Sequence, residues 1–335
     1  MERTHYHLDL IFANLFFGAN FSFYVSLTRG YGVGFQQIFL LQILSAALFF
    51  IPFALFSRGG WRLGWRDAVR IVLVSLLVVY GWMYLLLKGA SATTPIDASV
   101  IATLGPAITL LLDHLLHPHR YLPGRVAGIV ISFLGAGILL FNQGFELTRG
   151  SQAEGNLFVL LAVVAIAANT VLIKPQLERH GTLVVMGWYY IVGLAATAPL
   201  FRHGFDPALL QRLPVGAQAE VAYILILGTV LPMYLLYRGA EKLTALHTAI
   251  YRYIQPLAAG LLAVTRGQAH FNAVNLTAAA FIFSGVMLMA AGYRYGRHRR
   301  RYRPYAPLPL RSDGRLPHYS AVIRSRHSSG TGREH

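Results

Sequence analysis

The chain is 335 residues long, with 55% hydrophobic residues, 13% charged residues and a mean hydropathy of +0.51. A single soluble core cannot bury that much apolar surface, so the composition excludes an ordinary soluble protein and requires lipid as solvent. Cysteine is absent, which excludes a disulfide framework, thiol catalysis and cysteine-ligated zinc. The net charge is +16, and most of the basic residues lie in the loops between the apolar segments and in a carboxy-terminal tail. This placement does not favour a nucleic-acid partner.

Apolar segments of about 20 residues, the length of a helix that crosses a bilayer, recur along the chain. In the first half they are Leu8 to Leu27, Gln36 to Phe56, Ala68 to Leu87, Pro95 to Leu115 and Gly124 to Asn142. In the second half they are Gly155 to Lys174, Leu183 to Phe201, Ala219 to Tyr237, Thr244 to Val264 and Asn272 to Tyr293. These segments predict an all-α membrane protein without a separate soluble domain.

The two halves of the chain share one register. The pattern Lys88-Gly89-Ala90, Thr94 and Pro106 returns with the same spacing as Arg238-Gly239-Ala240, Thr244 and Pro256. Because each half holds five spans, an odd number, the second copy must lie inverted in the bilayer. We predict ten transmembrane helices as two inverted five-helix repeats, residues 1–146 and 150–294. Secondary transporters are built in this way, with the solute site near the midplane between the repeats.

Basic residues favour alternate loops. If the amino terminus is cytoplasmic, the inner segments before the tail hold eleven Lys and Arg residues and the outer loops hold six. The positive-inside rule then places both termini in the cytoplasm. We expect the protein to lie in a plasma membrane, such as the bacterial inner membrane. We predict that residues 295–335 form a disordered basic tail whose arginines are attracted to anionic lipid headgroups.

Arg252 lies near the centre of the ninth span, where a charged side chain is disfavoured by about 2.5 to 3.5 kcal/mol. Helical spacing places it on one polar stripe with Thr244, Thr248, Tyr251 and Gln255. We expect Arg252 to bind a carboxylate or phosphate of a solute, with Tyr251 and Gln255 beside it. The alternative is an arginine that is bonded only to carbonyls and a neighbouring side chain.

Asp97 and His247 occupy equivalent positions in the two copies. A carboxylate is the simplest proton carrier and histidine titrates nearest neutrality, so this pair predicts proton coupling. Asp97 also falls in the first turn after Pro95, where a negative side chain stabilises the helix dipole, and this structural role is the alternative.

Pro106 and Pro256 lie mid-span at equivalent positions, and each frees a backbone carbonyl from the helical hydrogen-bond ladder. Paired helix breaks of this kind point to a transporter site. Five further side chains deep in the spans are predicted to bind solute, the alternatives being interfacial aromatic residues and interhelical hydrogen bonds: Tyr80, Tyr84, Tyr234, Asn20 and Asn169.

Three histidines, His114, His117 and His119, stand at the inner end of the fourth span. Pro118 interrupts their turn, and Asp113 is the one carboxylate near them in sequence, so the spacing is a weak signal for a metal site. We predict no metal and no other cofactor.

With these residues identified, the chain resembles the drug/metabolite transporter superfamily, in the branch built from two EamA-like domains. The resemblance rests on Phe16-Phe17-Gly18-Ala19-Asn20-Phe21 and on the segments Ala92 to Leu112 and Leu243 to Val264, and it covers residues 8–293. It implies ten helices, both termini inside, and export or exchange of small organic solutes, often amino acids and related metabolites. The family's frequent arginine of the second helix is Gln42 here, and Pro118 and Gln268 replace its acidic residues.

The leading prediction is therefore a secondary transporter, an exporter or exchanger of small organic solutes with an anionic group, and not an enzyme. Two other functions stay open at this point: a membrane-embedded metal-dependent enzyme, and a non-transporting sensor or scaffold that uses the basic tail. The sequence leaves the identity of the solute, the coupling ion and the oligomeric state open.

Overall fold

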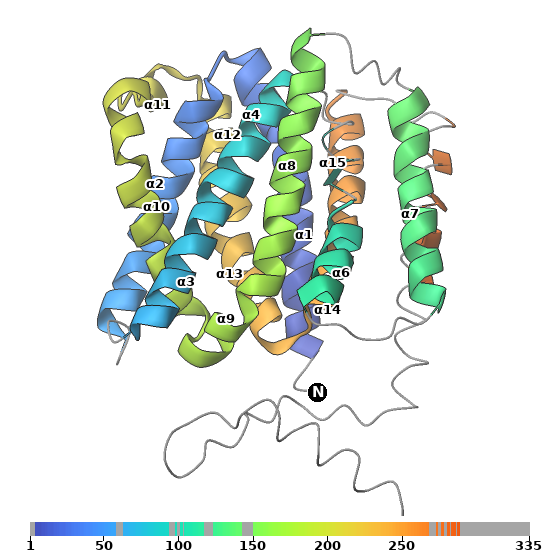
Figure 1. Ribbon diagram of the computed structural model, residues 1–335. Coiled ribbons are helices and arrows are strands. Elements are labelled where there is room, and N and C mark those ends of the chain that lie inside the picture. The colour runs from blue at the N-terminus through green and yellow to red at the C-terminus, as the bar shows by residue number, and fades with distance from the viewer. Residues whose placement is uncertain are drawn as a thin grey trace, which may run out of the picture. The chain divides into compact units, whose positions relative to one another are not determined.

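The computed structural model describes residues 4–57, 63–93, 98, 101–102, 104–116, 123–142 and 150–267, with further single positions between 273 and 288. Within these residues every regular element is helical (Figure 1). Met1–Gly292 form one compact unit. The tail that we predict to be disordered, residues 295–335, lies outside the described residues.

The first half of the chain begins with α1 (Thr4–Val25), which continues into a π-helical turn, η1 (Ser26–Gly30). The helix α2 (Phe35–Phe56) follows. The next helix is continuous but has three parts: α3 (Trp65–Leu76), the π-helical η2 (Leu77–Tyr84) and α4 (Leu85–Ala92). The half ends with α6 (Gly105–Leu116) and α7 (Pro123–Asn142). Proline suits the first position of α7 because the backbone N–H that it lacks would have no partner within the helix there.

The second half follows a similar order. It contains α8 (Gly150–Leu172), the short α9 (Lys174–His180), α10 (Thr182–Gly204) and the single turn α11 (Leu209–Arg212). A second three-part helix comes next, with α12 (Val215–Leu225), the π-helical η3 (Ile226–Val230) and α13 (Leu231–Lys242). The described helices end with α14 (Ala245–Ile250), the 3₁₀ turn η4 (Tyr251–Tyr253) and α15 (Ile254–Thr265).

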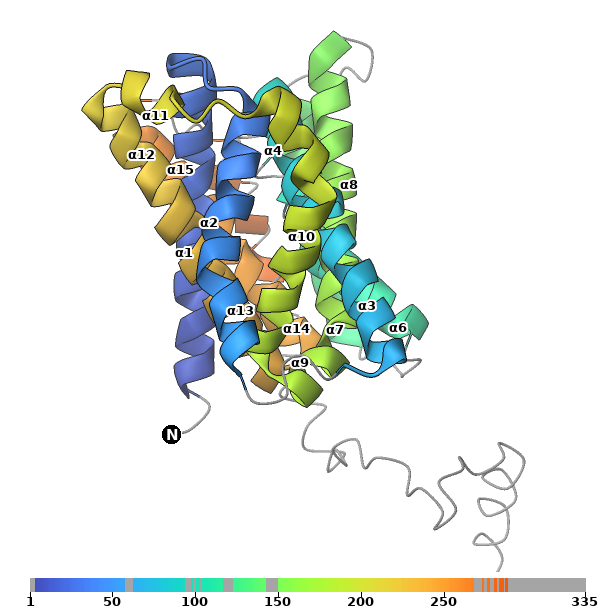
Figure 2. The ribbon, with the colours of Figure 1, turned by 90° about the vertical axis from the view of Figure 1, so that its left-hand side faces the viewer.

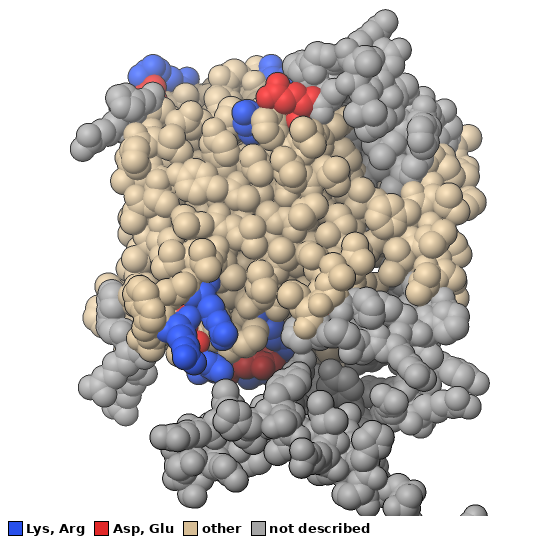
Figure 3. All heavy atoms as spheres, in the orientation of Figure 1, with Lys and Arg blue, Asp and Glu red and all other residues tan. Residues whose placement is uncertain are grey.

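Six of the helices are long and apolar enough to cross a bilayer, and they correspond to the first, second, third, sixth, seventh and eighth predicted spans. Among the described residues on the face drawn in Figure 3, Lys, Arg, Asp and Glu lie near the upper and lower rims, and a band without these residues separates them. The described part of the chain is thus all-helical, with the apolar spans of a multi-pass membrane protein. The count of ten spans stays a prediction.

The two three-part helices, α3-η2-α4 and α12-η3-α13, carry their π-helical segments at nearly equivalent positions of the two copies. A π-helical turn contains one residue more than an α-helical turn, so the side chains that follow it point toward a different face of the helix. Such turns are frequent at functional sites.

The long helices pack in pairs that link the two halves. The helices α2 and α10 lie side by side (Figures 1 and 2), α4 packs along α8, and α13 packs along α1. Glycines permit close crossings, since a Cβ added at Gly187 of α10 would lie 2.2 Å from Ala54 of α2. The interfaces between helices of different halves surround the interior in which the main cavity lies.

Candidate functional site

A cavity with an empty volume of about 740 Å³, including the part open to solvent, lies between helices of both halves. Its walls come from α1, α2, η2, α4, α8, η3, α13 and the interrupted fourth and ninth spans. The residues that line it are Phe17, Asn20, Phe21, Tyr24, Gln42, Trp82, Met83, Leu86, Leu87, Ala102, Gly105, Val163, Ile166, Gly228, Thr229, Met233, Arg252 and Gln255. Most of these residues are apolar or aromatic and a few are polar, which is the composition typical of sites for small organic molecules.

Equivalent residues of the two copies meet at the cavity. Ala102 and Arg252 occupy the same register position, as do Gly105 and Gln255, and all four line the cavity. At both positions the first copy supplies a small residue and the second supplies a long polar one. The first copy therefore leaves space into which the second copy projects its hydrogen-bonding groups.

Arg252 is the one charged residue among the described residues that line the cavity. Its side chain starts from η4, and the residue is 8% exposed. A guanidinium nitrogen, Nη2, donates to the hydroxyl of Thr170 at 3.0 Å, whereas Nε has no partner among the described residues. None of the described carboxylates forms an ion pair with it. A buried cation with so few partners can bind an anion at little desolvation cost, because its own water is already lost.

A second, smaller cavity of about 200 Å³ also has Arg252 in its lining. Asn169 lines it and is fixed by two tyrosines: its Nδ2 donates to the Tyr189 hydroxyl at 2.8 Å, and its Oδ1 accepts from the Tyr237 hydroxyl at 2.8 Å. Arg252 and Thr170 belong to this lining too. Arg252 thus borders two internal spaces.

Gln255 and Asn20, two further predicted binding residues, line the main cavity. Gln255 Nε2 donates to Asn14 Oδ1 at 2.7 Å, which ties the ninth span to α1. Asn20 Nδ2 donates to the backbone oxygen of Gly228 at 2.7 Å. These bonds hold both amides in fixed orientations on the wall.

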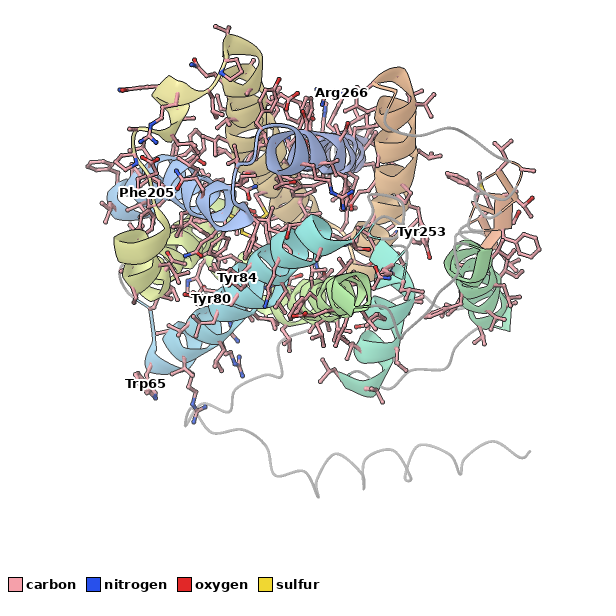
Figure 4. The ribbon with its side chains drawn as sticks, turned by 90° about the horizontal axis from the view of Figure 1, so that it is seen from above. Trp65, Tyr80, Tyr84, Phe205, Tyr253 and Arg266 are labelled. Carbon is pink, nitrogen blue, oxygen red and sulfur yellow. The ribbon has the colours of Figure 1, made fainter. Side chains whose placement is uncertain are left out.

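The four predicted tyrosines do not line the main cavity. Tyr80 and Tyr84 lie next to each other (Figure 4), with ring centroids 5.9 Å apart, and Tyr80 donates to the backbone oxygen of Ala196. Tyr234 packs its ring 5.3 Å from the guanidinium carbon of Arg238. In η2 the residues on the cavity wall are Trp82 and Met83 instead. Because π-helical winding changes the face that each residue presents, α-helical spacing cannot locate them.

The fourth tyrosine, Tyr251, contacts the amino-terminal end of α1. Its hydroxyl lies 2.9 Å from His7 Nδ1, and the ring of His7 meets the ring of His247 edge-on at 5.7 Å. His247 Nδ1 lies 2.8 Å from the Thr244 hydroxyl, which caps α14. Asp97, the other residue predicted to carry protons, lies outside the described residues.

The two predicted helix breaks have different forms. Pro106 is the second residue of α6, and the backbone turns at Leu104 just before it. Pro256 lies inside α15, directly after the 3₁₀ turn that carries Arg252. In both spans the regular helix is interrupted within a few residues of the proline, on the amino-terminal side.

Sequence reasoning missed most of the apolar wall and one amide. Asn20, Phe21 and Tyr24 follow Phe17 on one face of α1, at offsets of three, four and seven residues. That stripe was a usable signal, but α1 is apolar on all sides and so no face stands out. The missed amide is Gln42, which the sequence presents only as the residue that replaces the family's frequent arginine.

Three comparisons with known proteins agree. The sequence model of the EamA-like transporter family matches residues 7–141 and 153–291. "Uncharacterized transporter YyaM" of Bacillus subtilis is 20% identical over 269 residues, 80% of this chain and 88% of that protein. A solved structure whose description reads "Crystal structure of protein" aligns with a TM-score of 0.65 at 19% identity, covering 87% of this chain and 97% of that one, so it shares the fold.

Two relatives carry names that state a solute. "Probable terminal-alkyne amino-acid exporter" of Streptantibioticus cattleyicolor is 26% identical over 264 residues, 78% of this chain and 84% of that protein. "Aromatic amino acid exporter YddG" of Ancylobacter novellus is 24% identical over 214 residues, 62% of this chain and 71% of that protein.

Proposed function

Because this chain belongs to the EamA-like transporter family, we propose that it is a secondary transporter that exports or exchanges a small organic solute with an anionic group. Amino acids and related metabolites are the proposed solutes, in keeping with the names of two relatives. The proposal assigns no enzymatic activity, and it places the protein in a plasma membrane, the bacterial inner membrane, with both termini in the cytoplasm.

The observation that carries this proposal is the burial of Arg252 on the cavity wall without a described carboxylate partner. A guanidinium in this position binds a carboxylate through two parallel hydrogen bonds and so orients the solute. The apolar wall, with Phe17 and Trp82 in edge-on contact at 5.7 Å, suits the remainder of an amphipathic solute.

The pairing of helices supports the proposed inverted repeats. By the shared register α8 is the equivalent of α1, and each packs against the end of a three-part helix from the other copy: α4 along α8, and α13 along α1. In Figure 1, α1 starts at the lower edge, beside the mark for the amino terminus, whereas α8 starts at the upper edge. This opposite direction is what two inverted five-helix units, residues 1–146 and 150–294, require.

Alternating access then uses the two cavities that meet at Arg252. We place the solute in the larger cavity in one state and let it leave past Asn169 and Thr170 in the other. Asn20 and Gln255 help to hold it, and the breaks before Pro106 and Pro256 let the fourth and ninth spans bend. Protons are the proposed coupling ions, with Asp97 and His247 as carriers.

Reconstitution into proteoliposomes tests the proposal. A panel of labelled amino acids and organic acids is offered with and without an imposed pH gradient, and counterflow is measured. We expect at least one anionic or zwitterionic solute to be transported, and Arg252→Gln to abolish its transport. Removal of a hydrogen bond to a charged group costs about 1.5 to 3 kcal/mol, so binding should weaken roughly ten- to hundredfold.

Arg212→Gln is the matched control, because Arg212 is exposed and pairs at 3.1 Å with the partly exposed Asp206. An exposed pair contributes about 1 kcal/mol or less, so this variant should transport normally. Unchanged transport by Arg252→Gln would contradict the assignment of the anion site. Transport of none of the panel by the wild-type chain would contradict the proposed solute class.

A further inference from the structure

Gln42 on α2 has an amide whose orientation is fixed by its neighbours. Its Nε2 lies 2.8 Å from the Tyr24 hydroxyl and 2.5 Å from Thr229 Oγ1. The Thr229 hydroxyl donates its single proton to the backbone oxygen of Ile224 at 2.8 Å, so Oγ1 accepts from Gln42. The group that faces Thr229 must therefore be the NH₂. The free atom of this amide is Oε1, which is buried and has no partner among the described residues.

Asn20 on α1 repeats this arrangement. Its Nδ2 donates to the backbone oxygen of Gly228, which can only accept, so this amide also has a single possible orientation. Its Oδ1 is buried and unpartnered among the described residues. The contact is close enough that a Cβ at residue 228 would lie 2.0 Å from Oδ1, so Asn20 lies as it does because residue 228 is glycine.

Two buried acceptors without donors are unusual, because an unsatisfied buried polar group costs about 1 to 3 kcal/mol. Asn20 and Gln42 are each 3% exposed, and both line the cavity that Arg252 lines. Their free atoms are acceptors, whereas the unpaired Nε of Arg252 is a donor. The residues that line the cavity thus carry unpaired groups of opposite hydrogen-bonding character.

From this geometry we propose that the carbonyl oxygens of Asn20 and Gln42 form a subsite for an N–H donor of the solute, in the first instance an ammonium group. The inference rests on the proposed function and deepens it: the solute is zwitterionic rather than merely anionic. Neutral amides suit this task better than carboxylates, because an acidic residue in the same cavity would pair with Arg252 and remove the anion site. No acidic residue is among the described residues of the lining.

A monovalent metal cation bound by the same oxygens shares this chemistry, since carbonyl and hydroxyl oxygens also bind such ions. The two sources differ in a measurable way. A metal cation would make binding of every solute depend on that cation, whereas an ammonium subsite distinguishes solutes by their own amino group.

The test uses the full chain in detergent and three probes with one carbon skeleton: norleucine, its isomer ε-aminocaproate, and hexanoate, which lacks the amino group. Dissociation constants are measured by titration calorimetry in sodium and in choline buffers. We expect at least one of the two amino acids to bind roughly tenfold or more tightly than hexanoate. The isomer that binds better reports the distance between the two subsites.

Gln42→Met keeps the length of the side chain and removes the acceptor. We expect it to abolish the preference for the amino acid while leaving hexanoate binding within about twofold of the wild type. Asn20→Leu is the second variant, used if Gln42→Met does not fold, and it should reduce the same preference. Ser45→Ala is the control, because Ser45 lies one turn from Gln42 on α2 and is not part of the cavity lining.

The outcomes separate this inference from the proposed function. Equal binding of hexanoate and both amino acids by the wild type, weakened for all three by Arg252→Gln, would overturn the ammonium subsite and leave the anion site standing. Sodium-dependent binding of all three probes that Gln42→Met removes would also overturn it, in favour of a metal cation. Failure of the wild type to bind any probe would overturn the proposed solute class and this inference with it.

Discussion

Lys88 and Arg238 hold equivalent positions in the two copies, yet their ionic partners differ. Both side chains are 38% exposed. Arg238 Nε donates at 2.7 Å to Asp9, whose side chain is 7% exposed, whereas Lys88 lies 4.0 Å from Glu154, whose side chain is 61% exposed. The difference lies in the partner, because a buried carboxylate depends on its cation far more than an exposed one does. The ion pair therefore stabilises the contact of α13 with α1 more than its counterpart stabilises the contact of α4 with α8.

Gly89 and Gly239, which follow these two cations, also differ in their contacts. Here the closer backbone contact is at Gly89, beside the weaker ion pair. A Cβ at Gly89 would lie 2.7 Å from the backbone oxygen of Gly155 and 2.9 Å from the backbone nitrogen of Val159. A Cβ at Gly239 would first meet the side chain of Leu10, at 2.6 Å. The first crossing brings two backbones into direct contact, whereas at the second a side chain lies closest and the backbone oxygen of Tyr6 would be 3.3 Å from the added Cβ. The α4–α8 pair is thus held by close backbone packing, and the equivalent α13–α1 pair is held by an ion pair.

The largest expected effect comes from Gly89→Ala. Because the added methyl group meets backbone atoms that cannot move aside, we expect a loss of about 3 kcal/mol, the upper end for overpacked sites, and a lower midpoint of thermal unfolding in detergent. Gly239→Ala is the matched variant, and it should cost about 1 kcal/mol because Leu10 can adjust. Equal destabilisation by the two alanines would break the comparison.

The second effect concerns the ion pairs. Arg238→Gln leaves Asp9 buried without its cation, and we expect a loss of about 2 kcal/mol, less than for a fully buried pair because Arg238 is partly exposed. Lys88→Gln should cost about 0.5 kcal/mol. The same thermal unfolding measurement checks both. High salt should leave the Arg238 variant's deficit almost unchanged, whereas a deficit screened by salt would mean that Asp9 is open to solvent.

How far the sequence could predict this molecule depends on the kind of signal. Membrane helices follow from hydropathy, because lipid requires a long apolar run, and the first, second, third, sixth, seventh and eighth spans were found within a few residues. The family followed from the residues around Pro106 and Pro256 and is confirmed by the match to two segments of the chain.

The cavity wall was harder to predict. Arg252 was identified because a mid-membrane charge is costly wherever it lies, and the structure places it on the wall. Tyr80 and Tyr84 were chosen by depth alone, and the π-helical η2 presents Trp82 to the cavity instead. Gln42 could not be assigned from sequence, because its significance lies in Thr229 of a distant helix, whose hydroxyl fixes the amide.

The smallest expected effect tests whether the two copies are sufficient for function. The family match ends at residue 291, so the basic tail belongs to neither copy. A chain that ends at residue 294 should transport at a rate within about twofold of the full chain, the change that about 0.5 kcal/mol produces. The tail's arginines would contribute only attraction to anionic headgroups, roughly 1 kcal/mol each, which affects membrane attachment of the tail rather than the cavity.

Transport by the shortened chain is measured in liposomes with and without anionic lipid, at matched protein content. Equal transport rates of the shortened chain in both lipids would show that the determinants of transport lie within the two copies. The comparison of equivalent positions in the two copies assumes this. A shortened chain that reaches the membrane and binds solute but no longer transports it would contradict this. The two copies alone would then not explain the mechanism, because the tail after residue 294 would also take part in the transport cycle.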